Sequence, residues 1–392
     1  MRHAFAFILA TGTALYALPA FAVDGPAFAE RLKAVYALQG GGGEIIYDGV
    51  EALGDNVKLK GVKFKVEPAT EFVLGDLLFE GVEEEGGDWS VAKTSIPDIN
   101  TTSDQSTVVM KGFVIENLIV PSEANTTTPF LLYDRAALDE VSVSIGGKPA
   151  FSMMDYEVLI EAPEPEVKIA FTSEAQSIVI NVVDLATDAK TLEGAKALGL
   201  EKIDAKLIMD GAWVAEKGQL DVTEFSFDIP NAGKIDFTFA IDGYTKDFMK
   251  TLQDVSKAAQ AAGTDENAQA AQGLAMLGLM QQLAYVSTNI RFDDAGLTNR
   301  AVEFAAKQQN ISAADLILQS KAVLPLVLGQ LQNPEFATAV SVAVGKFLDD
   351  PKSLEIDATP AEPVPGAMLM ATGVGNPMEL IKTLNVTVKA NE

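Results

Sequence analysis

Alternation of apolar and polar residues is the strongest pattern in the first half of the chain, and it predicts strands that are buried on one face. Residues 56–66 (NVKLKGVKFKV) set valine, leucine and phenylalanine against lysine on both sides of Gly61. The same alternation recurs within residues 70–96, 106–120 and 138–162. We therefore expect an antiparallel meander, preceded by an amphipathic helix at residues 27–38.

The pattern changes in the second half. Residues 176–185 (QSIVINVVDL) are apolar at consecutive positions, which predicts a strand that is covered on both faces. Residues 218–244 predict a hairpin with its turn at 230–233. Helical spacing, capping residues and a Ser312–Asp315 capping box predict helices at 245–262, 264–286, 312–331 and 333–348.

Several shorter segments complete the expected order of elements. Residues 292–306 (FDDAGLTNRAVEFAA) are predicted to form a turn and a strand. The end of the chain is predicted to run strand, strand, short helix and strand. The strands are expected over residues 353–360, 366–372 and 383–390, and the short helix at Asn376-Pro377.

These elements predict an α+β fold, with antiparallel meander and hairpin sheets and a C-terminal half covered by amphipathic helices. Two prolines and three glutamates interrupt the strand pattern between residues 161 and 171. We therefore predict a β-rich N-terminal domain over residues 23–165 and an α+β C-terminal domain over residues 166–392.

The N-terminus has the order of a secretory signal. Arg2 and His3 precede an apolar run to Leu18, and the small-residue pattern Ala20-Phe21-Ala22 follows Pro19. This order predicts a signal peptide at residues 1–22 that is cleaved after Ala22, which would place the mature protein in the periplasm. No later run reaches the roughly 20 apolar residues that span a bilayer, so no membrane span is expected after cleavage.

Charge and composition narrow the classes of partner and of chemistry. Because a formal net charge of −26 repels the phosphate backbone, we expect no nucleic-acid partner. The chain has no cysteine, and its single histidine, His3, lies in the predicted signal. Most zinc sites, Fe–S clusters, haem ligation by histidine, and cysteine or histidine-activated serine nucleophiles are therefore excluded from the mature protein, and we expect no cofactor and no metal.

Carboxylate and lysine chemistry remains open. Acidic groups at 83–88, 184–188, 293–294 and 349–350 could bind calcium, but none has the spacing of an EF-hand loop. No pair of carboxylates is singled out for a hydrolase. Ser256-Lys257 and Ser320-Lys321 are adjacent pairs, and neighbouring residues on a helix do not face each other.

The apolar segments of the second half suggest a binding groove instead. If the helices leave part of the sheet open, an apolar groove of the size of a lipid chain would lie between them. The alternative is an ordinary core, which buries the same residue types. The residues expected to line the groove are Ile178, Ile180, Val182, Phe237, Phe239, Met276, Met280, Leu324 and Leu328.

A family resemblance supports the same setting. In residues 290–306, 347–370 (FLDDPKSLEIDATPAEPVPGAMLM) and 384–390 (LNVTVKA), the chain resembles uncharacterised exported proteins of alphaproteobacteria and, more distantly, AsmA and YdgA-like envelope proteins. The resemblance implies a long antiparallel sheet, residence in the periplasm and, from AsmA, a role near lipids. It implies no catalytic residues. The chain is shorter than AsmA and is expected to lack a retained anchor.

The expected function is that of a non-catalytic, envelope-associated periplasmic protein that binds an acyl lipid or another apolar ligand. A structural or protein-interaction module of the periplasm is the alternative, with an envelope protein as its partner. A hydrolase based on carboxylates or lysine is the third hypothesis. The patterns leave the oligomeric state open.

Overall fold

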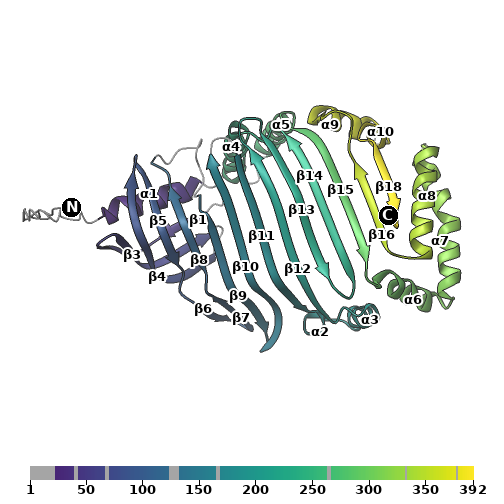
Figure 1. Cartoon of the computed structure of the whole chain (residues 1–392), viewed down its shortest axis with the longest axis horizontal. Coiled ribbons are helices and arrows are strands. Elements are labelled where there is room, and N and C mark those ends of the chain that lie inside the picture. Colours follow the sequence, from purple (N-terminus) through teal and green to yellow (C-terminus); the bar gives the residue numbers. More distant parts are fainter. Residues whose placement is uncertain are drawn as a thin grey trace, which may run out of the picture.

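The computed structural model describes residues 23–38, 43–66, 70–122, 132–164, 168–262, 266–331, 333–376 and 378–392. Its main feature is one large antiparallel sheet that runs through the length of the molecule (Figure 1). The predicted signal peptide and its cleavage site after Ala22 lie outside the described residues.

The strands of the first half are β1 (Gly43–Ile46), β2 (Gly49–Leu53), β3 (Asn56–Val66), β4 (Thr70–Glu85), β5 (Asp88–Ser95), β6 (Ile99–Ser103), β7 (Ser106–Lys111), β8 (Val114–Val120), β9 (Arg135–Ile145) and β10 (Lys148–Glu164). Those of the second half are β11 (Lys168–Asn181), β12 (Lys202–Val214), β13 (Gln219–Ile229), β14 (Gly233–Asp242), β15 (Ala284–Asp294), β16 (Ser353–Ala358), β17 (Val364–Pro365) and β18 (Val386–Ala390).

The helices are α1 (Gly25–Leu38), α2 (Val182–Leu185), α3 (Ala189–Leu198), α4 (Lys246–Ala262), α5 (Glu266–Met280), α6 (Leu297–Gln309), α7 (Ala313–Leu328), the 3-10 turn η1 (Gly329–Leu331), α8 (Pro334–Asp349), α9 (Gly366–Gly375) and α10 (Glu379–Thr383).

Strand pairing follows the chain closely. Strands β1 and β2 both pair with β3, and the sheet then continues through β4, β5 and β8 to β9. From β9 each strand up to β16 pairs with the next, with β17 beside the start of β15, and β18 pairs with β16 at the far edge. Strands β6 and β7 form a side branch on β9. Because β10 and β11 pair along most of their length, the sheet is continuous across the boundary predicted at residues 165/166.

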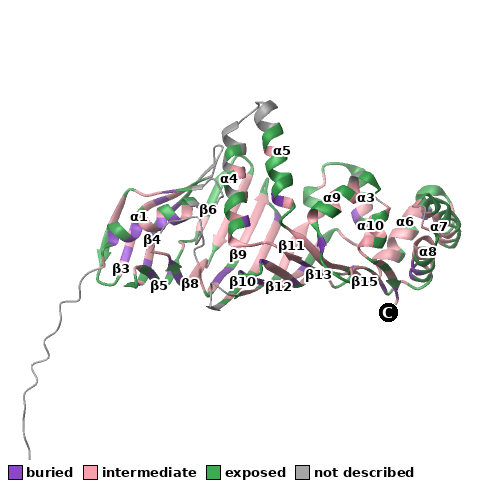
Figure 2. Ribbon diagram, turned by 90° about the horizontal axis from the view of Figure 1, so that it is seen from above, coloured by how far each residue is buried: buried purple, intermediate pink, exposed green. Residues whose placement is uncertain are grey.

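The fold class is confirmed. The protein combines an antiparallel sheet of hairpins with helices that are concentrated in its C-terminal half. In Figure 2, α4, α5, α6, α9 and α10 lie on the same side of the strands. Helices α4 and α5 form a hairpin that projects away from the sheet at one rim, whereas α7 and α8 lie at the end opposite the N-terminus (Figures 1 and 2).

Two well-packed regions hold helices to the sheet. In the N-terminal half, Phe28 of α1 is fully buried, and its ring meets the rings of Phe79 and Trp89 edge-on at centroid distances of 5.2 and 5.8 Å. In the C-terminal half, Phe347 of α8 packs on Phe292 of β15 with centroids 6.3 Å apart. Aromatic pairs of this geometry add to the stabilisation that burial provides.

Four element predictions need correction. Residues 297–309 form the helix α6, although residues 292–306 were expected to form a turn and a strand. The side chain of Asp294 explains the difference: it accepts hydrogen bonds from the backbone N–H groups of Gly296 and Thr298, at 2.7 and 2.8 Å, and so caps the start of the helix.

The segment GAMLMAT is also helical, because it begins α9. Its first residue, Gly366, donates its N–H to Leu283 O at 2.7 Å and lies so close to Met280 O that a Cβ would be 2.2 Å away. Alanine, leucine and methionine are strong helix formers, so the chain continues as a helix after this contact.

The other two corrections concern element ends. Helix α5 ends at Met280, so the helix predicted over 264–286 stops early, and Ala284 already belongs to β15. Strand β11 ends at Asn181, and residues 182–185 turn into the short helix α2. The exposed fractions of Val183 and Leu185 are 41% and 40%, so the expected cover on both faces is wrong for this segment.

Candidate apolar ligand site

The sheet has one apolar and one charged face, which follows directly from its register. Directly paired residues of an antiparallel sheet have side chains on the same face. One row of paired residues crosses nine strands from β3 to β13: Val57, Phe79, Thr94, Ile115, Ala136, Val158, Ser173, Met209 and Phe225. A second row on that face runs from β9 to β18: Leu138, Tyr156, Ala175, Leu207, Phe227, Ile235, Phe292, Leu354 and Ala390.

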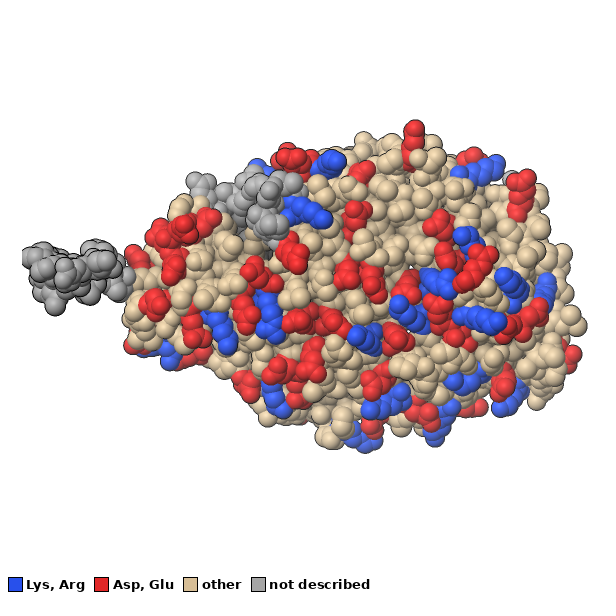
Figure 3. Space-filling model, in the orientation of Figure 1, with Lys and Arg blue, Asp and Glu red and all other residues tan. Residues whose placement is uncertain are grey.

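The opposite face is charged. Its central row includes Glu157, Glu174, Ser226, Asp236, Arg291, Glu355 and Lys389. Figure 3 shows acidic and basic side chains interspersed over the face that is seen in the orientation of Figure 1. Ion pairs such as Lys206–Glu174 and Lys234–Asp236 connect neighbouring strands or positions on this face. The charged face therefore meets water, and the apolar face is the side on which helices pack.

The helices cover the apolar face only in part. In the second row, Ile235 has an exposed fraction of 47%. Ile290 and Ile356, which pair with each other beside this row on the same face, are each 42% exposed. By contrast, Val57 is fully buried in the row under α1. Part of the apolar surface between the helices is thus open to solvent. The helices do not seal this part of the sheet as an ordinary core.

The enclosed part of this surface lies in the N-terminal half, between α1 and the sheet. A partly enclosed pocket of about 530 Å³ is found there. This volume is within the range of small-molecule sites, whereas ordinary cores contain few voids larger than a water molecule. The described lining residues are Leu32, Tyr36, Ile45, Leu59, Phe64, Leu77, Phe79, Thr94, Ile96, Phe113, Ile115, Leu118 and Tyr133. We call this the α1 pocket.

The α1 pocket carries few polar groups. None of its described lining residues is charged. The hydroxyl of Thr94 is occupied, because it donates to Leu78 O at 3.0 Å. Tyr36 packs against Phe64 with ring centroids 5.1 Å apart, and burial raises the pKa of Tyr36. Such a lining favours an uncharged, apolar chain over an ionic ligand.

Tyr133 is the remaining polar residue of the α1 pocket, and its backbone is held firmly beside β8. Ile119 N donates to Leu132 O at 2.7 Å, and Asp134 N donates to Glu116 O at 3.1 Å. Burial raises the pKa of the Tyr133 hydroxyl, and Tyr156 contributes to the same shift. Tyr156 belongs to the second apolar row, and its hydroxyl accepts a 3.0 Å hydrogen bond from Ser173, which is 3% exposed.

The predicted groove residues fall into three groups. Ile178 and Ile180 on β11 pair with Ala205 and Ile203 of β12, and Phe237 and Phe239 on β14 pair with Ile290 and Thr288 of β15. All four lie on the apolar face, separated by β12 and β13. Val182 begins α2, just beyond the end of β11. The remaining four lie on helices: Met276 and Met280 on α5, and Leu324 and Leu328 on α7.

The structure therefore places only four of the predicted groove residues on one surface, the apolar face of the sheet, and part of that face is open to solvent. The enclosed pocket lies under α1, and none of its lining residues is in that set. Part of the pocket was nevertheless predictable. The amphipathic helix at 27–38 and the strand at 56–66 were both expected, and both contribute lining residues. The space between them depends on how closely α1 approaches the sheet, which no periodicity reports.

Helix α7 adds a second exposed apolar surface. Leu318, Val323, Leu326 and Val327 have exposed fractions of 68%, 52%, 74% and 55%. By length and composition alone, residues Ala313–Leu331 could cross a membrane, with a mean hydropathy of 1.2 and none of the segment buried. The segment also contains Asp315 and Lys321, and Lys321 pairs with Asp349 of α8. The expected absence of a membrane span after signal cleavage stays a prediction.

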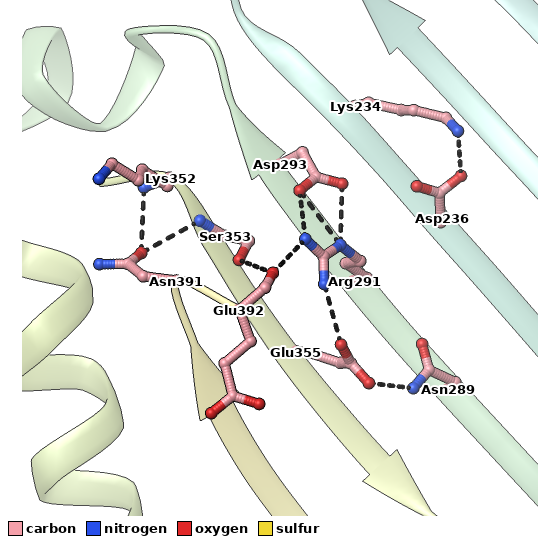
Figure 4. A network of polar contacts seen from close by, with 10 residues as sticks. All are labelled: Lys234, Asp236, Asn289, Arg291, Asp293, Lys352, Ser353, Glu355, Asn391 and Glu392. Carbon is pink, nitrogen blue, oxygen red and sulfur yellow. Dashed lines mark hydrogen bonds and ion pairs between the residues drawn. The ribbon is translucent and has the colours of Figure 1, made fainter. Parts of the chain in front are cut away.

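Several of the acidic residues considered for calcium have structural contacts. Asp188 caps α3 by accepting from Thr191 N at 2.8 Å, Asp294 caps α6, and Asp293 binds Arg291 (Figure 4). Among the residues that the structure describes, no three histidine or acidic side chains are grouped as a metal site would require. Asp188 and Asp294 thus act as helix caps, and Asp293 as an ion-pair partner.

One polar hollow lies where β9, β10 and β11 lose their regular pairing. It has a volume of about 200 Å³, and its lining includes Asp139, Asp155, Glu157 and Glu174. Arg135 also lines it and forms ion pairs with Glu116 and Glu157, the latter at 2.5 Å. A hydrolase based on carboxylates would use acids of this hollow. One of them, Glu157, is already paired with Arg135.

Comparisons with known proteins add little to this geometry. A family model that is described only as "Uncharacterized protein" matches residues 226–391, from β13 to the end of β18. No curated protein matches the chain. The matched segment contains the C-terminal part of the apolar face but excludes the α1 pocket.

Proposed function

We propose that this protein is a non-catalytic, envelope-associated protein of the periplasm that binds the acyl chain of a lipid or a similar apolar ligand in the α1 pocket. The observation that carries the proposal is the uncharged lining of a pocket of about 530 Å³ in the otherwise packed N-terminal core. The register supports it as well, because Phe79, Thr94 and Ile115 of the pocket belong to a row that continues across the apolar face. A long chain therefore has apolar surface available beyond the pocket.

The setting in the periplasm rests on the predicted signal at residues 1–22. The proposal of a non-catalytic role rests on composition, because a mature chain without cysteine or histidine lacks the usual nucleophiles and bases at neutral pH. Carboxylates remain available for chemistry, and the hollow beside Arg135 is the place to test by substitution if activity is ever detected.

The decisive experiment fills the pocket. Ile96 lines the pocket, and Ile96→Trp should occupy its volume and remove binding of an apolar fluorescent probe such as N-phenyl-1-naphthylamine. Leu159→Trp is the matched control, because Leu159 is 41% exposed and pairs with Arg135 on the charged face. Native mass spectrometry of the exported protein should also detect a co-purified lipid in the wild type and not in Ile96→Trp.

A third variant separates the pocket from the open part of the apolar face. Phe237→Asp places a charge among the predicted groove residues of β14 and leaves the α1 pocket intact. If Phe237→Asp abolishes probe binding and Ile96→Trp does not, the ligand binds on the open face and the α1 pocket is an empty void. Binding that is unaffected by both variants contradicts the proposal altogether.

A second candidate function is a protein-interaction module. Exposed apolar patches on a soluble domain commonly mark interaction sites, and α7 presents Leu318, Val323, Leu326 and Val327 to solvent. Crosslinking in the periplasm, with Leu326→Asp as the control, tests this function. A partner that is captured by the wild type and lost in the variant supports it, and the same set of products from both proteins contradicts it.

A further inference from the structure

The sheet ends at β18 with backbone groups that have no partner. Among the described residues, β18 pairs with β16 on one side and with no strand on the other. Every second residue of an antiparallel strand bonds to its neighbour, and the residues between point their backbone groups the other way. Asn391 N donates to Ser353 O at 2.8 Å, so the odd-numbered residues of β18 face β16. The N–H and C=O groups of Val386 and Val388 therefore point away from the sheet.

Helix α8 covers one part of this edge and leaves the other open. It lies beyond β18 at the end of the molecule opposite the N-terminus (Figure 1). Ala343 and Phe347, in its second half, form a buried cluster with Ala390. Asn391 Nδ2 donates to Asp350 O at 2.8 Å and ties the ends of β18 and α8 together. Beside the first half of α8, a groove of about 430 Å³ lies between the helix and the strand.

This groove reaches the edge of the strand itself. Three consecutive residues of β18, 386–388, line it. Because side chains of consecutive strand residues point to opposite faces of a sheet, a hollow that touches all three is open to the backbone between them. Phe336 and Ala339 of α8 and Ile381 of α10 supply apolar lining on the side of the helices. The groove thus combines unpaired backbone groups with apolar side chains.

An extended peptide matches both features. A strand added antiparallel to β18 would bond to the N–H and C=O groups of Val386 and Val388. Val386 and Val388 lie on the same face as Ala390, which ends the second apolar row. The two peptide residues opposite them would therefore meet Phe336 and Ala339, and the residue between would turn to the charged face. The predicted order is apolar, polar, apolar.

Charge indicates what flanks these residues. Glu335 lines the groove from the first turn of α8 and, within the described part of the chain, has no ion-pair partner. The cation of the groove, Lys382, already lies 3.6 Å from Glu379. The protein has a formal net charge of −26, so a lysine or arginine in the peptide is favoured. The same charge repels a second copy of this chain, whose β18 carries its own α8 beside it.

We propose that the groove between β18 and the first half of α8 binds an extended, basic segment of a partner protein, which joins the sheet as an antiparallel strand beside β18. This site is separate from the α1 pocket and from the exposed apolar surface of α7. It does not depend on lipid binding.

A phage-displayed library of random decapeptides, panned on the full mature chain, tests the proposal. The enriched peptides should share two apolar residues separated by one position, with a lysine or arginine nearby. Ala339→Trp fills the groove from an exposed position on α8, and it should weaken binding of a selected peptide by about tenfold or more. Glu335→Lys should weaken binding as well, because it repels the basic residue.

Val342→Trp is the matched control. Val342 belongs to the same helix, is 64% exposed and is not among the described lining residues of the groove. Its tryptophan variant should bind the selected peptide as the wild type does. If panning enriches no peptide for the wild type over Ala339→Trp, or if the selected peptide binds both equally, the proposal is overturned and the lipid proposal stands.

The mode of binding is tested on the selected peptide by methylating its backbone nitrogens one at a time. Methylation of an N–H that faces β18 removes a bond of the ladder, and it should weaken binding by about tenfold. Methylation at the residues between should have little effect, because their N–H groups point away from β18. Losses without this alternation along the peptide would show that it does not bind as an added strand, which overturns the proposal.

Discussion

At the scale of single residues, Arg291 joins three parts of the C-terminal sheet through one guanidinium group (Figure 4). It donates to Asp293 on β15, to Glu355 on β16 at 3.0 Å and to the backbone carbonyl of Glu392 at 2.9 Å. Its side chain is 28% exposed, so water screens part of this attraction. We expect Arg291→Ala to lower the free energy of unfolding by about 1 kcal/mol in urea denaturation.

Two further variants make that result specific. Arg291→Lys keeps the charge and loses the planar fork, so it should recover only part of the stability. Lys352→Ala removes a cation whose pair with Asp350 is exposed on both sides, with fractions of 68% and 67%, and it should change stability by roughly 0.5 kcal/mol or less. If both alanine variants have the same small effect, the network around Arg291 contributes no more than an ordinary surface pair.

At the scale of elements, Phe28 is the largest fully buried side chain that α1 packs against the sheet. Its side chain is fully buried against Phe79 and Trp89, so Phe28→Ala should destabilise the protein by roughly 3–5 kcal/mol. The same substitution at Phe72 of β4, which is 53% exposed, should cost about 0.5 kcal/mol or less. Thermal or urea unfolding of the two variants tests the difference, and similar losses would show that α1 is not held by this contact.

The sequence predicted an element correctly where its hydrophobic residues follow one clear period. It failed where a contact between distant residues determines how the element begins. The strands around Gly61, the Ser312 cap of α7 and the Asn333 cap of α8 were all expected, and both caps are present, with Ser312 accepting from Asp315 N at 3.0 Å and Asn333 from Phe336 N at 3.2 Å. Helices α6 and α9 were missed because their starts depend on Asp294 and on the contact of Gly366 with α5. The α1 pocket was missed for a related reason, since helix and strand patterns do not report the gap between two elements.

At the scale of the whole molecule, the continuous sheet bears on how the protein unfolds. Strands β9 to β12 pair with one another across the boundary predicted at 165/166, so no break in hydrogen bonding separates the two predicted domains. The two tryptophans lie on opposite sides of this boundary and are both buried, with Trp89 at 6% and Trp213 at 7% exposed. They therefore report on each half independently.

We expect the two halves to unfold together. Trp89→Phe and Trp213→Phe each leave a single fluorescent reporter, and a cooperative molecule requires that the fluorescence midpoint of each variant in urea equals the circular dichroism midpoint of the same variant. A fluorescence midpoint that differs from the circular dichroism midpoint of the same variant would instead support two independently stable domains. In that case the paired strands β10 and β11 would be an interface between domains, and loss of Phe28 should lower only the midpoint reported by Trp89. If the midpoints coincide, loss of Phe28 should lower stability throughout the sheet, because the pocket and the open apolar face would then belong to one folding unit.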